Sequence, residues 1–221
     1  MKRTLIAAAL SVGLVGTGSA AAVSMGDQYV LRAYTGQALG LALTNELDVH
    51  TLGIAQNRSS ICATLGGAIA GEAVAHNRDN NVLSSAALAE ASDAAEAVQP
   101  LLDKEAIVLA FGGEIAPEEN QAMVAATLAA LAEADYDGRI VLHVAVWAPK
   151  MMEKAAAANP AIAEYLAGKN NINALTVDAA EQKALLHDVA LEDGKQVSRG
   201  VVHEMPMNDS WTGLFRAALG K

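Results

Sequence analysis

Residues 106–147 read AIVLAFGGEIAPEENQAMVAATLAALAEADYDGRIVLHVAVW, and this stretch indicates the fold class. Its two ends, 106–111 and 139–147, are short apolar runs, typical of strands that are buried on both faces. Between them, 117–134 has helical spacing, and Pro117 followed by two glutamates suits the first turn of a helix. A strand, a helix and a second strand in this order predict a βαβ unit of a parallel sheet.

The remainder of the chain continues the alternation between strand-like and helix-like segments. Strands are expected at 28–34, 49–55, 72–76 and 195–202, and helices at 35–47, 59–66, 83–102 and over most of 150–190. We therefore predict an α/β fold: a Rossmann-like, doubly wound parallel sheet that forms a single domain over residues 23–221.

Composition narrows the class of protein. Of 221 residues, 52% are hydrophobic and only 4% aromatic, so we expect an aliphatic core. The formal net charge is −10 and no long basic run occurs, so nucleic acid is not an expected partner. Cys62 is the single cysteine, which excludes an internal disulfide, and no metal site is predicted.

Residues 1–22, MKRTLIAAALSVGLVGTGSAAA, have the layout of a secretory signal peptide. A working signal predicts a periplasmic or secreted protein, and a non-functional one a cytoplasmic protein. The apolar run is short and rich in glycine, so no membrane span is expected after processing. The same segment contains GTGSAA (16–21), which matches a dinucleotide-binding spacing, but the strand-like runs that follow it lie at unsuitable distances.

Residues 35–42, TGQALGLA, follow a predicted strand and open a predicted helix. Gly36 and Gly40 would let the backbone turn tightly and approach a pyrophosphate, which the helix N-terminus would then bind through its free N–H groups. A plain strand-to-helix turn explains the same glycines equally well.

Several of these motifs together resemble the short-chain dehydrogenase/reductase family. Thr35-Gly36-Gln37-Ala38-Leu39-Gly40 is similar to the family's nucleotide turn, Gly138-Arg139-Ile140-Val141 to its fifth strand, and YLAGK (165–169) to its Tyr-x-x-x-Lys motif. The order and rough spacing of the matching elements extend over residues 28–209. The resemblance implies an NAD(P)-dependent oxidoreductase that transfers hydride to or from a small carbonyl or alcohol.

The resemblance also implies the cofactor and its contacts. Thr35, Gly36 and Gly40 would bind the cofactor at the turn, and Gly113 would line the cofactor site after the apolar strand at 106–111, where the family has Asn-Asn-Ala-Gly and this chain keeps only the last glycine. Arg58 stands where the family meets a 2′-phosphate, and no acidic residue is present there to hold a bare ribose. NADP is therefore the expected cofactor, and NAD is less expected.

Catalysis falls, by the same resemblance, on Tyr165 and Lys169. The tyrosine would act as the general acid, and the lysine would lower the pKa of that tyrosine and bind the cofactor ribose. A spacing of four residues places both side chains on one helix face. An amphipathic tyrosine beside a solvated lysine remains the alternative.

The sequence departs from the family where a substrate-binding serine is expected. Val144, Ala145 and Val146 occupy that place, His143 is the polar group on the strand, and Asn120 lies too near the start of its helix to replace the family's asparagine. A catalytically degenerate Rossmann-like domain, either a nucleotide sensor or an exported interaction protein, therefore stays open beside the enzyme. Members of the family often assemble into dimers or tetramers, so a homo-oligomer is left open as well.

Overall fold

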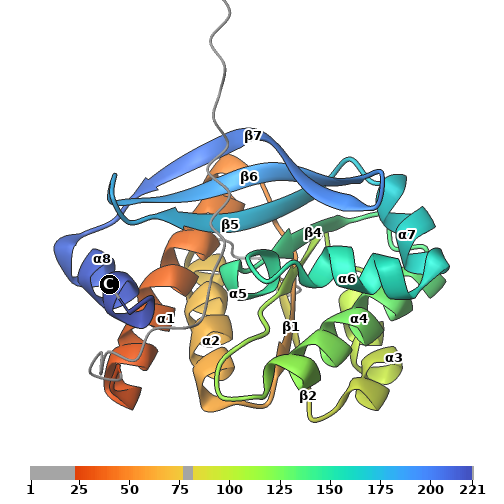
Figure 1. The fold of residues 1–221 in the computed structure, drawn as a ribbon, viewed down its shortest axis with the longest axis horizontal. Helices are drawn as coiled ribbons and strands as arrows, with labels where there is room; N and C mark the ends of the chain where they lie inside the picture. The colour runs from red at the N-terminus through yellow and green to blue at the C-terminus, as the bar shows by residue number, and fades with distance from the viewer. Residues whose placement is uncertain (1–22, 77–81, 221) are drawn as a thin grey trace, which may run out of the picture.

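The computed structural model of the chain describes residues 23–76 and 82–220. A seven-stranded sheet with the order β2-β1-β3-β4-β5-β6-β7 forms its centre (Figure 1). Its strands are β1 Leu52–Asn57, β2 Leu83–Leu88, β3 Ala106–Leu109, β4 Arg139–Leu142, β5 Ile172–Asp178, β6 Lys183–Glu192 and β7 Lys195–Pro206. The pairs from β2 to β5 are parallel, whereas β6 and β7 are antiparallel to their neighbours.

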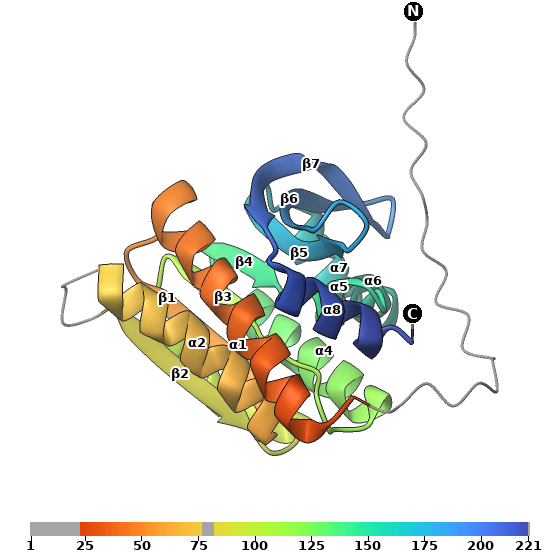
Figure 2. The ribbon, with the colours of Figure 1, turned by 90° about the vertical axis from the view of Figure 1, so that its left-hand side faces the viewer.

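Helices cover both faces of the sheet, so the prediction of a doubly wound α/β domain is confirmed. They are α1 Met25–Leu41, α2 Ser60–His76, α3 Ala94–Ala97, α4 Pro117–Glu133, α5 Val144–Trp147, α6 Met151–Ala158, α7 Pro160–Ala167 and α8 Asp209–Ala218. Short π- and 3₁₀-helical turns lie at Ala42–Glu46, Ala91–Asp93 and Gln99–Leu101. The helices α1, α2 and α8 pack on one face (Figure 2), and α3, α4, α6 and α7 pack on the other.

The two faces are held by separate apolar clusters that meet in the central strands. In β3 all four side chains are fully buried, and they alternate between the two clusters: Ala106 and Val108 face α1 and α2, whereas Ile107 and Leu109 face α4. This alternation follows from the period of two along a strand. A strand buried on both faces must be apolar throughout, which agrees with the apolar run at 106–111.

The strand order reverses between β1 and β3. After β1 the chain moves outward to β2, and after β2 it crosses back over β1 to β3. Connections leave these two strands in opposite directions, so a crevice is expected outside their carboxyl ends, where open α/β sheets bind ligands. We refer to this side of the sheet as the carboxyl edge, and to the opposite side as the amino edge.

Residues 28–34, predicted as a strand, lie within helix α1. Ser24 caps this helix, because its hydroxyl accepts a hydrogen bond from the backbone N–H of Asp27 at 3.1 Å. Buried Leu31, Thr35 and Leu39 recur every fourth residue along one face. The helical period over the whole segment therefore overrides the local alternation of QYVLRAY.

Three further segments differ from the prediction. Residues 72–76, expected as a strand, form the last turn of α2, and residues 83–88, expected as helix, form β2. Helix was expected over most of 150–190, but it gives way to β5 and β6 from Ile172 onward. These strands contain alanine, leucine and serine, whose local preferences are weak, so pairing with neighbouring strands decides their conformation.

The signal-like segment 1–22, with its GTGSAA stretch, lies outside the described residues. Within the described part of the chain, no helix has the length and apolar character needed to cross a membrane.

Candidate functional site

Thr35, Gly36 and Gly40 lie within α1, which continues as a π-helical turn to Glu46, so the predicted phosphate-binding turn is wrong. The Thr35 hydroxyl donates to the Leu31 carbonyl one turn earlier, at 2.8 Å. A Cβ on Gly36 would lie 2.6 Å from the carbonyl oxygen of Leu65 on α2. A helix interior has no free N–H groups for a phosphate, because its backbone is hydrogen bonded internally. These residues serve helix packing.

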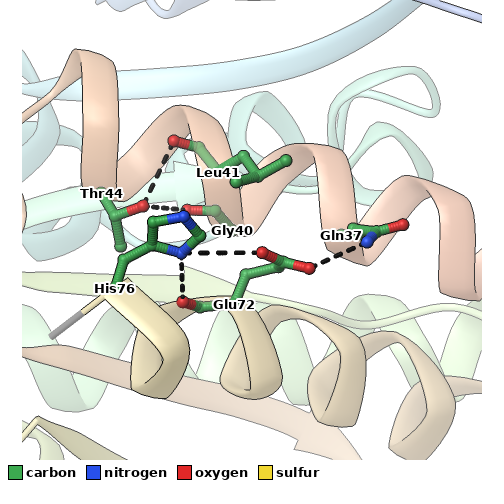
Figure 3. Close-up of polar contacts among 6 residues, drawn as sticks. All are labelled: Gln37, Gly40, Leu41, Thr44, Glu72 and His76. Atoms are coloured by element: carbon green, nitrogen blue, oxygen red, sulfur yellow. Dashed lines mark hydrogen bonds and ion pairs between the residues drawn. The ribbon is translucent and has the colours of Figure 1, made fainter.

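Gly40 allows the same close approach one turn further along α1. A Cβ there would lie 2.7 Å from the Cβ of Glu72 on α2. Figure 3 shows the polar contacts over this packing: Gln37 donates to the Glu72 carboxylate at 2.9 Å, and the His76 ring lies 3.7 Å from its other oxygen. The Thr44 hydroxyl donates to the Gly40 carbonyl at 3.1 Å. Small residues thus bring two parallel helices into contact.

The side chains of Tyr165 and Lys169 are close together, but they do not share a helix face as predicted, because α7 ends at Ala167 and Lys169 lies beyond its C-cap, Gly168. The Tyr165 hydroxyl and the Lys169 Nζ both donate to the backbone carbonyl of Tyr136, at 2.8 and 2.7 Å. The Lys169 Nζ also lies 5.0 Å from the centre of the Tyr165 ring. Burial raises the pKa of the Tyr165 hydroxyl, whereas a catalytic role needs a lowered pKa. Both groups are therefore engaged within the protein.

A pocket of about 850 Å³ borders this pair at the amino edge, between the end of α4 and α7. Its acidic lining residues are Glu133, Asp135, Asp137 and Glu164. Asp137 and Asp135 favour the charged form of Lys169, although burial lowers the pKa of this lysine overall. The pocket is thus acidic, and its one lysine already contacts protein groups.

Arg58 and Gly113, by contrast, lie at the carboxyl edge. Arg58 directly follows β1, is exposed, and donates through Nε to the carbonyl of Ala87 on β2 at 3.2 Å. Gly113 follows β3 in the left-handed conformation, with a φ of 76°. The structure thus brings two of the predicted cofactor residues to the ends of adjacent strands. It places Tyr165 and Lys169, the predicted catalytic residues, at the amino edge instead.

Six residues gather where the connections leave β1, β3 and β4, and we refer to them as the switch-point site. They come from α1, the end of β1, the start of α2, and the loops after β3 and β4. The residues are Arg32, Asn57, Ser59, Cys62, Gly113 and His143.

Two buried asparagines hold the loops of this site. Asn57 and Asn120 are 0% and 3% exposed. The Asn57 side chain donates to the Gly112 carbonyl at 2.7 Å and to Asn120 Oδ1 at 2.8 Å, and it accepts from the Ser59 N–H at 2.9 Å. Asn120 Oδ1 in turn accepts from the Gly112 N–H at 3.1 Å. The pair fixes the loop after β3 against the start of α2.

Helix α2 begins at this loop with unused donors. The Ser59 hydroxyl caps it by accepting from the Cys62 N–H at 3.2 Å. Within the described residues, the N–H groups of Ser60 and Ile61 have no hydrogen-bond acceptor. The first turn of α2 contains no acidic residue, whereas α4 carries two in its first turn. The positive end of the α2 dipole therefore has no acidic partner from its own first turn, although Glu114 from the loop after β3 accepts from the Ser60 hydroxyl at 3.1 Å.

Arg32 supplies a positive charge beside the same helix end. It is partly buried, and it makes no hydrogen bond or ion pair to the described residues. Burial lowers the pKa of its guanidinium, and its charge acts on both Cys62 and His143. An arginine stays charged in proteins, so this site keeps a cation without an internal counter-ion.

His143 is 1% exposed and caps the short helix α5. Its Nδ1 accepts from the Ala145 N–H at 3.3 Å, while its Nε2 has no hydrogen-bond partner among the described residues. Burial, together with the charge of Arg32, lowers the pKa of the ring to about 3, and the backbone of Phe111, which interacts with the ring, partly opposes this shift. The ring is therefore neutral at physiological pH.

Cys62 is not an activated nucleophile. Its thiol is 1% exposed and donates to the Gly112 carbonyl at 3.4 Å. Burial raises the pKa of the thiol, although Ser59 and Arg32 partly oppose this effect. Across the described ranges, no cluster of three or more His, Cys, Asp or Glu side chains is arranged to hold a metal ion.

Sequence reasoning missed Arg32, because its segment was predicted as a strand. The available signal was the pair Ser24 and Asp27, a capping serine with an acidic residue three positions later. A helix starting there places Arg32 one turn after Tyr29, whose hydroxyl contacts the Ser60 hydroxyl at 2.9 Å. His143 was recognised only as a polar group on a strand.

The fold and the switch-point site define an α/β protein with a doubly wound sheet and a polar carboxyl edge. The chain belongs to the protein family described as "Uncharacterized protein", whose model matches residues 28–214. No curated protein sequence matches the chain.

Among solved structures, the chain is similar to the solute-binding protein of an ABC transporter from R. palustris, crystallised in complex with benzoate. The two are 11% identical, with a TM-score of 0.48, and the match covers 81% of this chain and 65% of that chain. The chain thus spans less than two thirds of the length of that protein, and the likeness does not bear on function.

Proposed function

We propose that this protein binds a small anionic molecule at the switch-point site. The observation that carries the proposal is the partly buried guanidinium of Arg32, which has no acceptor among the described residues. Charged groups in protein interiors are paired, because removing a charge from water without compensation is costly. An anionic ligand would supply the missing partner.

The surroundings of Arg32 support the same function. The site lies where the strand order reverses, which is the usual position for ligands of open α/β sheets. The free N–H groups of Ser60 and Ile61 point out of the start of a 17-residue helix, where anions are favoured. The Asn57–Asn120 pair holds the loops in place, so little ordering is needed on binding.

Hydride transfer with NADP stays a prediction from the sequence. Its residues are divided between the two edges of the sheet, with Arg58 and Gly113 at the carboxyl edge and Tyr165 and Lys169 at the amino edge. The geometry therefore supports a binding function more than a catalytic one. NADP⁺ is still a useful test ligand, because it is itself anionic.

Isothermal titration calorimetry of the purified chain with acetate, methanesulfonate, sulfate, phosphate and NADP⁺ tests the proposal. At least one of these anions should bind, and Arg32→Gln should weaken binding by roughly 10- to 100-fold, as expected for a charge-assisted hydrogen bond of about 1.5–3 kcal/mol. Arg32→Lys should keep part of the affinity, because it retains the charge.

Arg199→Gln is the matched control. This exposed arginine on β7 pairs with Glu192 at 3.0 Å, so its loss changes the net charge equally but should leave affinity unchanged. Absence of binding by all five anions would overturn the proposal, as would equal effects of the Arg32 and Arg199 substitutions.

A further inference from the structure

The pocket between the end of α4 and α7, which we refer to as the amino-edge pocket, combines a concave shape with unpaired negative charge. Its volume of about 850 Å³ is within the range of pockets that bind small molecules. Glu133, Asp135, Asp137 and Glu164 line it. Across the described residues, none of these carboxylates makes a side-chain hydrogen bond or an ion pair.

The carboxylates are spread around the pocket. Asp135 and Asp137 flank Tyr136 in the loop after α4, whereas Glu164 lies on α7. In the part of the chain that the structure describes, no three such groups are placed to hold one metal ion. A compact cation therefore does not match their spacing, whereas a ligand that carries several separated positive charges does.

Two helices end at this pocket. Glu133 is the last residue of α4 and Gly168 is the C-cap of α7, and both line the pocket. The last turn of each helix contains no basic residue. Because the C-terminal end of a helix carries a partial negative charge, it favours a nearby cation. The two helix ends thus act in the same direction as the carboxylates.

The tyrosines of the pocket already contact an ammonium group. The Lys169 Nζ lies 5.0 Å from the centre of the Tyr165 ring and 5.6 Å from the centre of the Tyr136 ring, and it donates to the Tyr136 carbonyl at 2.7 Å. Ring faces attract cations in this way. Lys169 is the only cation among the described residues that line the pocket, so it leaves most of the negative charge uncompensated.

We propose that the amino-edge pocket binds a small organic polycation with separated ammonium groups, such as a linear polyamine. The ammonium groups of the ligand pair with Asp135, Asp137 and Glu164. Lys169 is the internal cation of the pocket, and it competes with the ligand for the tyrosine rings and the carboxylates. This site lies at the edge of the sheet opposite the switch-point site, so it does not depend on the proposed anion binding.

Calorimetry of the purified chain with butylamine, putrescine and spermidine tests the proposal, because these ligands form a series of increasing positive charge. Affinity should rise along the series by roughly two- to fivefold with each added ammonium group, as expected for one exposed ion pair. Magnesium chloride is the control for a compact charge, and it should bind more weakly than spermidine.

Asp135→Asn and Asp193→Asn form a matched pair of variants. Both residues are exposed and left-handed, with φ of 48° and 50°, and asparagine adopts this conformation readily, so both variants should fold. Asp135→Asn should weaken spermidine binding by roughly two- to fivefold, and the double variant with Asp137→Asn by about tenfold. Asp193 lies outside the pocket, in the turn between β6 and β7, so its variant should bind as the unmodified chain does.

Lys169→Gln tests the competition with the internal cation. The Tyr165 hydroxyl still donates to the Tyr136 carbonyl in this variant, so the contact between α7 and the loop before β4 is kept. Spermidine should bind roughly two- to fivefold more tightly, because the pocket loses its own positive charge. Unchanged or weaker binding would separate the ligand from Lys169 and overturn its placement in this pocket.

Three other results would overturn the proposal: no binding of spermidine, magnesium binding as tightly as spermidine, or equal effects of the Asp135 and Asp193 variants. A tetralysine peptide that binds more tightly than spermidine would assign the pocket to a basic protein segment and would also overturn it. Arg32→Gln should leave spermidine binding unchanged, so failure of the anion proposal and failure of this one are distinguishable.

Discussion

The amino and carboxyl edges of the sheet use similar polar groups in different ways. At the amino edge, the Tyr165 hydroxyl and the Lys169 Nζ converge on one backbone carbonyl. At the carboxyl edge, Arg32 and the Nε2 of His143 have no partner among the described residues, although the asparagines beside them are fully bonded. Buried polar groups are usually satisfied, so the edge with unsatisfied groups is the better candidate for anion binding.

The comparison also shows that adjacency of residues is weak evidence for chemistry. Tyr165 and Lys169 are as close as a catalytic pair requires, yet burial shifts the tyrosine pKa in the wrong direction for proton transfer. Their contacts join α7 to the loop before β4, which is a structural role. Three substitutions, each with its own control or readout, test these structural roles.

The largest effect is expected at the carboxyl edge. Asn57→Ala should lower the free energy of unfolding by about 3 kcal/mol, because it leaves the Gly112 carbonyl and the Ser59 N–H without their buried partner. Urea unfolding followed by circular dichroism measures this change. It should also weaken anion binding, since the loops are no longer held.

Asn170→Ala is the control at the amino edge. Asn170 is an exposed residue that lines the pocket beside Lys169, so its loss should change stability by less than about 0.5 kcal/mol. If Asn57→Ala and Asn170→Ala lowered the free energy of unfolding equally, the hydrogen bonds at the carboxyl edge would contribute no more to stability than those at the amino edge.

A smaller change in stability is expected from a substitution where α1 packs against α2, away from both edges of the sheet. Gly36→Ala should destabilise by about 1–2 kcal/mol, because overpacking against the Leu65 carbonyl exceeds the gain in helix propensity. Gly67→Ala on α2 has free space around the new methyl group and should stabilise by about 0.5–1 kcal/mol. Thermal denaturation of both variants gives the comparison.

Gly36→Ala should leave anion affinity unchanged, since the residue packs a helix and faces no ligand. A variant of full stability that no longer binds anions would restore a ligand-binding role for the glycine and would displace the site from the carboxyl edge.

The smallest effect is expected from Tyr165→Phe. At pH 7 this substitution should lower the free energy of unfolding by about 0.5–1 kcal/mol. The loss is small because Lys169 still donates to the Tyr136 carbonyl. Anion affinity should not change. A variant with lower affinity and unaltered stability would assign the tyrosine to a ligand site and contradict its structural role.

The same variant tests the raised tyrosine pKa. Folding favours the neutral phenol, so its contribution to stability is complete below the unfolded pKa of about 10 and is lost as the pH rises above it. The urea midpoint of the unmodified chain should therefore fall above pH 10. Tyr165→Phe should show a shallower decline, with Tyr136, whose pKa is also raised, accounting for the remainder.

Predictions from sequence succeeded where a segment had one dominant pattern. The strand at 106–109 and the helix at 117–133 were expected within a few residues, because an apolar run and a capped amphipathic segment are explicit local signals. The strand prediction for residues 28–34 was wrong, because seven residues that alternate between apolar and polar can also form part of a longer helical face. The helical signal lies in a longer window, which includes the Ser24 cap and the buried Leu31, Thr35 and Leu39.

The site was predicted in part. Arg58 and Gly113 were each expected to follow a strand, and the structure places both at the carboxyl edge. Arg32 and His143 are remote from each other in the chain, and no spacing rule joins a residue of α1 to the end of β4. Their proximity arises only because α1 packs over the central strands.

The amino-acid sequence alone was sufficient to predict the α/β class. Apolar runs that alternate with amphipathic segments can form only a few compact arrangements. It was also sufficient to place Tyr165 and Lys169 close together, because that contact is local. The tertiary structure decided which polar groups find partners inside the protein. Hydrogen bonding and burial are properties of residues distant in sequence, so only the packed sheet separates the satisfied lysine at one edge from the unpaired arginine at the other.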